Sequence, residues 1–142
     1  LFDAFTEVIQ YANDGLKKEL CITIMKKHSD DLMGSLLSEN WFAINSACNV
    51  LRVICFVGPA AVQLSNQKVP FSAIRNLPDM IRNTKTRYRV VRWINAMIRN
   101  DPQNLGKQVL LRQDIMSAIV EGIYRDSDFL TNEVRLPAIV HD

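Results

Sequence analysis

Residues 84–102, TKTRYRVVRWINAMIRNDP, have the clearest periodicity in this chain and restrict most strongly what it can fold into. Projected at about 100° per residue, as in an α-helix, the apolar side chains share one broad stripe and a polar ridge lies opposite. The stripe contains Val90, Val91, Trp93, Ile94, Met97 and Ile98, and the ridge contains Tyr88, Arg92, Asn95 and Arg99. We therefore expect a long helix that buries Trp93, Ile94 and Met97 between neighbouring helices and leaves the ridge at the surface.

Helical periodicity continues through nearly the whole chain, and the alternation typical of strands is absent. We expect further helices at about 2–12, 16–24, 29–37, 41–57, 60–64, 72–82, 105–111 and 114–124. Ser29 and the two aspartates after it are candidate N-caps for the third of these helices. Gly58 and Pro59 should end the fourth, because proline cannot continue a helix interior. The last segment, with Pro137, should be a frayed tail or a short helix, so the sequence predicts an all-α fold.

The composition and charge are typical of one globular domain. The 142 residues are 48% hydrophobic and 23% charged, and the net charge is +2. Residues 68–113 contain ten basic and two acidic residues, whereas the remainder contains seven basic and thirteen acidic ones. No run approaches the roughly 18 apolar residues that a membrane span requires. We expect residues 1–142 to form a single domain with a basic centre and, because the chain begins with Leu1, to be a fragment of a longer protein.

The cysteines indicate a reducing compartment. There are three, an odd number, and Cys48 and Cys55 are seven residues apart on one predicted helix. That spacing separates them by about 10 Å along the axis, which is too far for a disulfide. The chain also lacks an Asn-x-Ser/Thr glycosylation site. We expect buried, reduced thiols in an intracellular protein of the cytoplasm or nucleus.

The chain resembles itself at a fixed interval. With a shift of 43 residues, Leu51 coincides with Ile94, Ile54 with Met97, and Pro59 with Pro102. With a shift of 89, Phe5 coincides with Ile94, Val8 with Met97, and Ile9 with Ile98. The helices that precede the long ones repeat at similar shifts. One unit would therefore consist of a short, a medium and a long helix in about 43 residues.

This unit resembles the armadillo and HEAT families of helical repeats, which have a similar length and helix content. The resemblance implies a right-handed superhelix of about three repeats: the last helix of one, two complete repeats, and the first two helices of another. It extends over almost the whole chain. Trp93 is followed four residues later by Met97, where well-matched armadillo repeats have asparagine. The alternative fold is a non-repetitive helical bundle, which would show much of the same apolar pattern.

The sequence predicts no catalytic, metal-binding or cofactor site, and hence no enzyme. His28 and His141 have no cysteine, serine or acidic residue at a spacing that would place both on one helix face. Gly106 and Lys107 lack the remaining residues of a phosphate-binding loop. The acidic residues between 126 and 133 lack the glycine and the spacing of a calcium loop.

The polar ridge is the candidate binding surface. Armadillo-like stacks line their long helices up side by side, so the resemblance implies a groove along them. The predicted partner-binding residues are Asn45, Asn49, Arg52, Tyr88, Arg92, Asn95 and Arg99. The arginines of the 84–102 helix have no acidic neighbour at i ± 4, so an acidic partner would relieve their repulsion. An ordinary solvated surface is the competing interpretation.

We therefore predict a non-enzymatic interaction module or scaffold that binds an acidic or mixed-charge peptide or protein through a basic groove. One alternative is nucleic-acid binding through the basic region 68–113. Another is a structural spacer or self-association domain. The aromatic residues favour protein over nucleic acid, because only Tyr88 and Trp93 lie in the basic helix and Trp93 is predicted to be buried.

Overall fold

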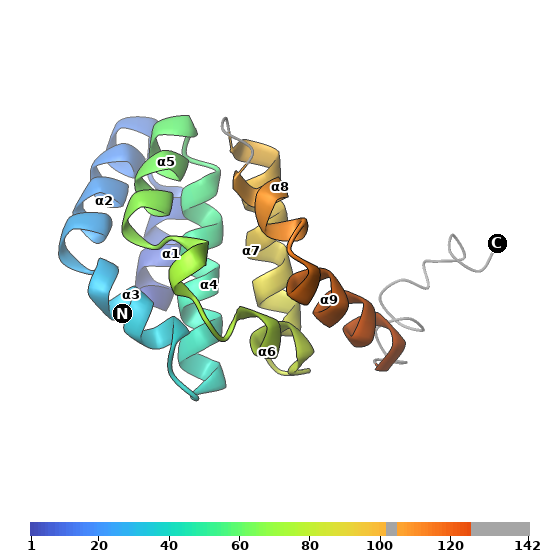
Figure 1. The fold of residues 1–142 in the computed structure, drawn as a ribbon. Coiled ribbons are helices and arrows are strands. Elements are labelled where there is room, and N and C mark those ends of the chain that lie inside the picture. Colours follow the sequence, from blue (N-terminus) through green and yellow to red (C-terminus); the bar gives the residue numbers. More distant parts are fainter. Residues whose placement is uncertain (102–104, 126–142) are drawn as a thin grey trace, which may run out of the picture.

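The computed structural model describes residues 1–101 and 105–125, which form nine α-helices, one 3-10 helix and no strand (Figure 1). The helices are α1 (Phe2–Tyr11), α2 (Asp14–Lys27), α3 (Ser29–Leu36), α4 (Trp41–Cys55), α5 (Pro59–Lys68), η1 (Phe71–Ala73), α6 (Leu77–Arg82), α7 (Arg87–Asn100), α8 (Leu105–Leu110) and α9 (Gln113–Arg125). The all-α prediction is therefore confirmed. The predicted tail around Pro137 lies outside the described residues.

Local side chains explain several helix boundaries. The Asn13 side chain accepts a hydrogen bond from the Leu16 amide at 2.9 Å, and Asn40 caps α4 in the same way. Gly58, with φ of 157°, ends the turn after α4, and Pro59 starts α5. The predicted caps of α3 are wrong, because its N-cap is His28 and no side chain caps it.

The long helices α1, α4 and α7 stand side by side, with α4 in contact with both of the others (Figure 1). Helix α5 packs on α2 and α4, α3 on α4, and α6 on α7 and α9. Helices that are three apart in chain order, such as α1 and α4 or α4 and α7, are therefore neighbours in space. The right-handed superhelix itself stays a prediction.

The buried positions of α4 and α7 follow the 43-residue shift. It pairs buried residues with buried residues: Ala47 with Val90, Val50 with Trp93, Leu51 with Ile94, and Ile54 with Met97. The shift of 89 matches burial less well, because it pairs Val8, which is 48% exposed, with the fully buried Met97. A shift of 88 pairs the buried Ile9 with Met97, but it also pairs Val8 with the buried Ala96. Burial therefore supports the interval between α4 and α7, and the interval to α1 stays a prediction.

Trp93 is fully buried, with its ring centroid 4.7 Å from that of Phe71. Ile94 and Met97 are also buried, as predicted for this stripe. Val91, by contrast, is 36% exposed, because no described helix covers that edge of α7. The apolar stripe of α7 is therefore only partly covered by the helices of the described chain.

Candidate binding face on the long helices

The predicted binding residues lie on two neighbouring helices, and we call them together the α4–α7 face. It consists of Asn45, Asn49 and Arg52 from α4 and Tyr88, Arg92, Asn95 and Arg99 from α7. Asn45 Nδ2 donates a hydrogen bond to the Lys85 carbonyl at 2.9 Å, which ties the start of α4 to the turn before α7. None of the seven residues is buried. The structure thus brings the two predicted ridges together.

Two arginines of α7 lie over the Tyr88 ring on this face. Arg92 Cζ lies 5.2 Å and Arg89 Cζ 5.4 Å from the centroid of the Tyr88 ring. Burial, and then the positive charge of Arg92, lower the pKa of Arg52 on the neighbouring helix. No carboxylate within the described ranges lies at ion-pair distance from these three arginines. The cluster is therefore a concentrated positive charge.

Exposed aromatic rings extend the face at both ends of α4. Lys85 Nζ lies 5.4 Å from the Trp41 ring, and Arg52 Cζ lies 5.3 Å from the Phe56 ring. Trp41 and Phe56 are 44% and 52% exposed. The predicted partner-binding residues include neither ring, although Phe56 is equivalent to Arg99 at the 43-residue shift. The face therefore alternates cations with aromatic rings more than the linear sequence indicated.

Arg99 lies apart from the other predicted residues. It is eleven residues beyond Tyr88, which corresponds to about 16 Å along the helix axis. It lines a shallow depression with Gly58, Pro59 and Asn100, at the opposite end of α7 from Tyr88. One ligand would contact Arg99 and the central arginines together only if it ran along the helix.

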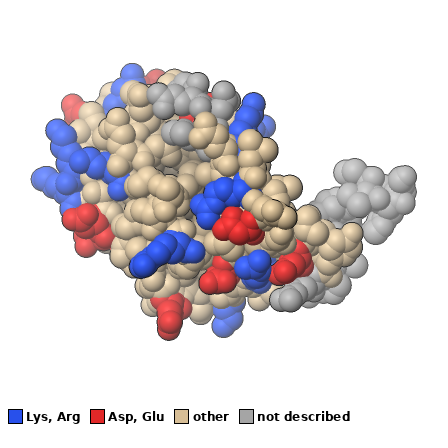
Figure 2. Space-filling view, viewed as in Figure 1, with Lys and Arg blue, Asp and Glu red and all other residues tan. Residues whose placement is uncertain are grey.

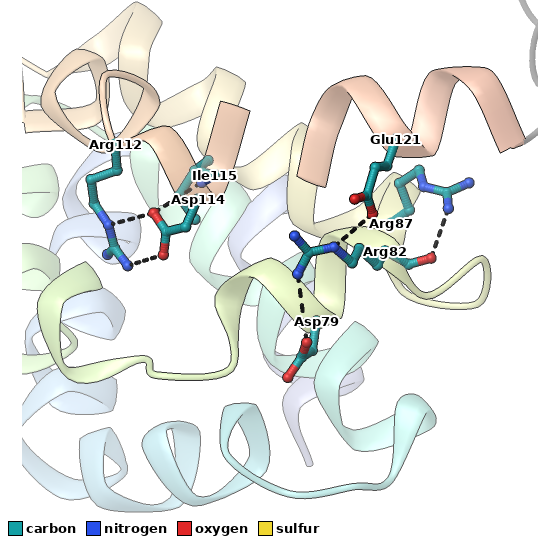
Figure 3. Close-up of polar contacts among 7 residues, drawn as sticks. All are labelled: Asp79, Arg82, Arg87, Arg112, Asp114, Ile115 and Glu121. Atoms are coloured by element: carbon teal, nitrogen blue, oxygen red, sulfur yellow. Dashed lines mark hydrogen bonds and ion pairs between the residues drawn. The ribbon is translucent and has the colours of Figure 1, made fainter. Parts of the chain in front are cut away.

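Other arginines of the basic region serve the fold. Arg82 Nε lies 2.8 Å from Glu121 Oε2 and also pairs with Asp79, and Arg112 pairs with Asp114 (Figure 3). On the face seen in Figure 2, blue cationic groups lie directly beside red acidic groups. The basic region is therefore not one continuous binding surface.

Arg87 is the most buried of these arginines, with 8% exposure. Its Nε donates to the Ile81 carbonyl and its Nη2 to the Arg82 carbonyl, both at 2.8 Å. These carbonyls belong to the end of α6, which the guanidinium therefore caps. Arg87, which was not among the predicted ridge residues, therefore serves the fold.

The described residues contain no group of three His, Cys, Asp or Glu side chains that could hold a metal ion. None of the helices in the described part is long and apolar enough to cross a membrane. His28 lies against the Phe5 ring, with Nδ1 3.4 Å from Asp31 Oδ2. The expectation that His28 has no suitably spaced acidic neighbour is therefore wrong. His141 and the acidic residues 126–133 fall outside the described ranges.

One protein family matches most of the chain. Residues 5–134 match the model of the Npa1 family, described as ribosome 60S biogenesis N-terminal. The chain belongs to the Npa1 family. No curated protein and no solved structure matched the chain. The Npa1 match covers the whole α4–α7 face, and the family description names ribosome biogenesis and no chemical reaction.

Proposed function

We propose that this Npa1-family domain is a non-enzymatic scaffold of 60S ribosome biogenesis that holds an acidic or mixed-charge protein segment on its α4–α7 face. The observation that carries the proposal is the placement of Arg89 and Arg92 over the Tyr88 ring and of Arg52 over the Phe56 ring, without a carboxylate of the described residues at ion-pair distance. Like charges so close together are held at an electrostatic cost. A carboxylate from a partner would offset that cost and accept charge-assisted hydrogen bonds.

The repeat architecture supports a groove along this face. We propose that α1, α4 and α7 are equivalent long helices of an armadillo- or HEAT-like right-handed superhelix, as their contacts and the matched burial of α4 and α7 suggest. In such a stack the α4–α7 face belongs to the inner surface. Asn49 and Asn95 would then supply amide groups that can hydrogen-bond the backbone of an extended segment. Asn45 contributes less, because its amide nitrogen already donates to Lys85.

A capture experiment tests the proposal. The wild-type domain and an Arg92→Glu/Arg99→Glu variant would be used to capture proteins from a cell extract, with pre-60S components as the expected partners. Arg75→Glu is the matched control, since Arg75 is an exposed cation of the same basic region outside the α4–α7 face. Loss of a partner with the double variant and retention with the control would support the proposal. Equal capture by all three proteins would refute it.

Single-stranded RNA is the second candidate ligand, and a specific observation favours it. Trp41, Phe56 and Tyr88 are exposed rings, each with a lysine or arginine within 5.5 Å of the ring centroid. Proteins that bind single strands combine stacking rings with cations in this way. A pre-60S particle contains both protein and RNA, so both candidates fit the family. If the domain instead bound neither and formed dimers in light scattering, the self-association alternative would hold.

The cellular site follows from the same family description. Building 60S subunits is an intracellular process, so we propose that the domain acts inside the cell, in the nucleus. Localisation of a tagged chain by fluorescence microscopy tests this placement.

A further inference from the structure

An apolar groove adjoins the α4–α7 face. Helix α9 lies on the opposite side of α7 from α4 (Figure 1), and the groove runs between α7 and α9 with a volume of about 450 Å³. The aliphatic residues that line it are Val91, Ile94, Ile98, Leu110, Ile119 and Ile123. Val91 and Ile123 are 36% and 40% exposed. Large apolar side chains of a partner would bind here favourably, because both surfaces would leave water.

The groove and the α4–α7 face share one row of residues. Tyr88, Arg92 and Asn95 belong to the face, and all three also line the groove. At about 100° per residue around α7, Val91 lies on one side of this row and Arg89 on the other. The row therefore has an apolar surface along one side and positive charge along the other.

An extended segment matches such a row, because its successive side chains point to opposite sides. Laid along α7, every second residue would face the groove and the residues between them would face Arg89 and Arg92. The Asn95 amide is exposed and makes no hydrogen bond within the described residues, so it can bond the backbone of the segment. A helical partner would offer few such groups, because its amides and carbonyls bond each other.

The length of the groove sets the length of the segment. From Tyr88 to Ile98 the α7 helix rises about 15 Å, which corresponds to four or five residues of extended chain. A segment of this length would place two or three side chains in the groove. The same number would face the arginines.

Charge and lining chemistry specify the side chains of the partner. Arg89 and Arg92 have no carboxylate of the described residues at ion-pair distance, so acidic side chains are favoured there. Among the described residues that line the groove, Tyr88 is the one aromatic residue, so the groove suits aliphatic side chains better than stacked bases. Building on the proposed function, we propose that the face and the groove together bind an extended protein segment in which large aliphatic residues alternate with acidic ones.

The test uses short fluorescent peptides with capped ends, whose binding to the full chain is measured by fluorescence polarisation. In the first peptide leucine and glutamate alternate, and in the second alanine replaces each leucine. We expect the leucine–glutamate peptide to bind at least about tenfold more tightly, because alanine buries much less apolar surface in the groove. A third peptide, with serine in place of each glutamate, should also bind more weakly than the first, because it lacks the carboxylates.

Variants of the chain assign the binding to the groove. Val91→Ser/Ile123→Ser should weaken the leucine–glutamate peptide at least about fivefold and leave the alanine–glutamate peptide unchanged. Met116→Ser/Val120→Ser is the matched control, since both residues are 45% exposed on α9 and neither lines the groove. This control should bind like the wild type. Val91→Ala/Ile123→Ala serves if urea unfolding shows that the serine variant does not fold.

The outcomes separate this inference from the proposed function. Equal affinity for the leucine–glutamate and alanine–glutamate peptides, both weakened by Arg92→Glu, would overturn the inference and leave the proposed function standing. Tight binding of the leucine–glutamate peptide that ignores Arg92→Glu would count against both. Absence of binding at about 1 mM peptide, as expected if a second copy of the chain or RNA occupied this surface, would also overturn the inference.

Discussion

At the scale of single residues, the packing of α7 depends on Trp93, which is fully buried and stacked on Phe71. We predict that Trp93→Ala lowers the free energy of unfolding by about 3 to 5 kcal/mol, because a large buried side chain would leave a cavity. Trp93→Phe is the matched control, and it should cost less than about 1.5 kcal/mol because the ring packing is largely kept. Urea unfolding measures both. A loss below about 1 kcal/mol for the alanine variant would contradict the assigned packing.

The buried thiols predict a decrease in stability at alkaline pH. Burial raises the pKa of Cys21 to about 11 and of Cys55 to about 12, and it also raises the pKa of Cys48. Below the unfolded-state pKa of about 8.5 the thiols favour neither state. As the pH rises above it, the unfolded thiols ionise while the folded ones stay neutral, so stability should fall by up to about 1.4 kcal/mol per thiol and pH unit.

Urea unfolding at pH 7 and pH 10 under reducing conditions measures this decrease. A Cys21→Ala/Cys48→Ala/Cys55→Ala variant is the control for lysines and tyrosines that titrate in the same range, and it should lose less stability between the two pH values. The three native thiols should also react slowly with a thiol reagent at pH 7, since they are buried. Rapid labelling of the folded protein would contradict their placement.

Gly122 should be required for the contact between α9 and Arg87. A Cβ on Gly122 would lie 2.5 Å from Arg87 Nε, whose position is held by the carbonyls that it caps. We predict that Gly122→Ala destabilises the domain by about 1 to 3 kcal/mol, despite the better helix propensity of alanine. Gly34→Ala is the matched control, because nothing lies within 4 Å of its Cβ. In urea unfolding, Gly34→Ala should stabilise the domain slightly. The same effect for Gly122→Ala would contradict the prediction, because it would mean that the Arg87 side chain can move aside at little cost.

At the scale of the helices, α7 should supply more binding energy than any other element. Charge reversal at Arg92 removes a charge-assisted hydrogen bond and adds repulsion, so Arg92→Glu should weaken an acidic ligand by at least about 1.5 to 3 kcal/mol. Arg75→Glu, with the same change of charge outside the face, should have a small effect. Calorimetric titration with a captured partner segment measures the difference. Equal losses in both variants would indicate a diffuse field instead of the α4–α7 face.

At the scale of the whole molecule, the salt dependence of binding distinguishes the two candidate ligands. Binding of nucleic acid releases counterions, so the logarithm of affinity falls with the logarithm of salt concentration by about 0.7 per neutralised phosphate of a single strand. We predict a shallower slope for an acidic protein segment, because fewer charges are neutralised. The domain would be titrated with the captured protein and with a single-stranded RNA at salt concentrations from about 50 to 200 mM. The two slopes of affinity against salt are then compared. Stronger RNA binding with a steep slope at physiological salt would favour the second candidate.

The sequence alone determined the features that depend on neighbours along the chain. Apolar spacing within one helix identifies Trp93, Ile94 and Met97 as buried, and Gly58 followed by Pro59 marks the break between α4 and α5. The 43-residue interval also makes Arg52 equivalent to Asn95 and Asn49 equivalent to Arg92, and the structure packs the helices that carry them, α4 and α7, against each other. These predictions succeed because helix geometry fixes which residues share a face.

Only the tertiary structure decided where the charged groups of different helices go. Arg87 and Arg92 look alike in the sequence, yet Arg87 caps the carbonyl end of α6 while Arg92 lies over Tyr88 on the α4–α7 face. The contact of Lys85 with Trp41, and the apolar groove beside α7, depend on how separate helices dock. Helical periodicity specifies the direction in which each side chain points around its own helix axis. Which residue it meets on another helix depends on how whole helices pack together, and the local spacing of residues does not encode that packing.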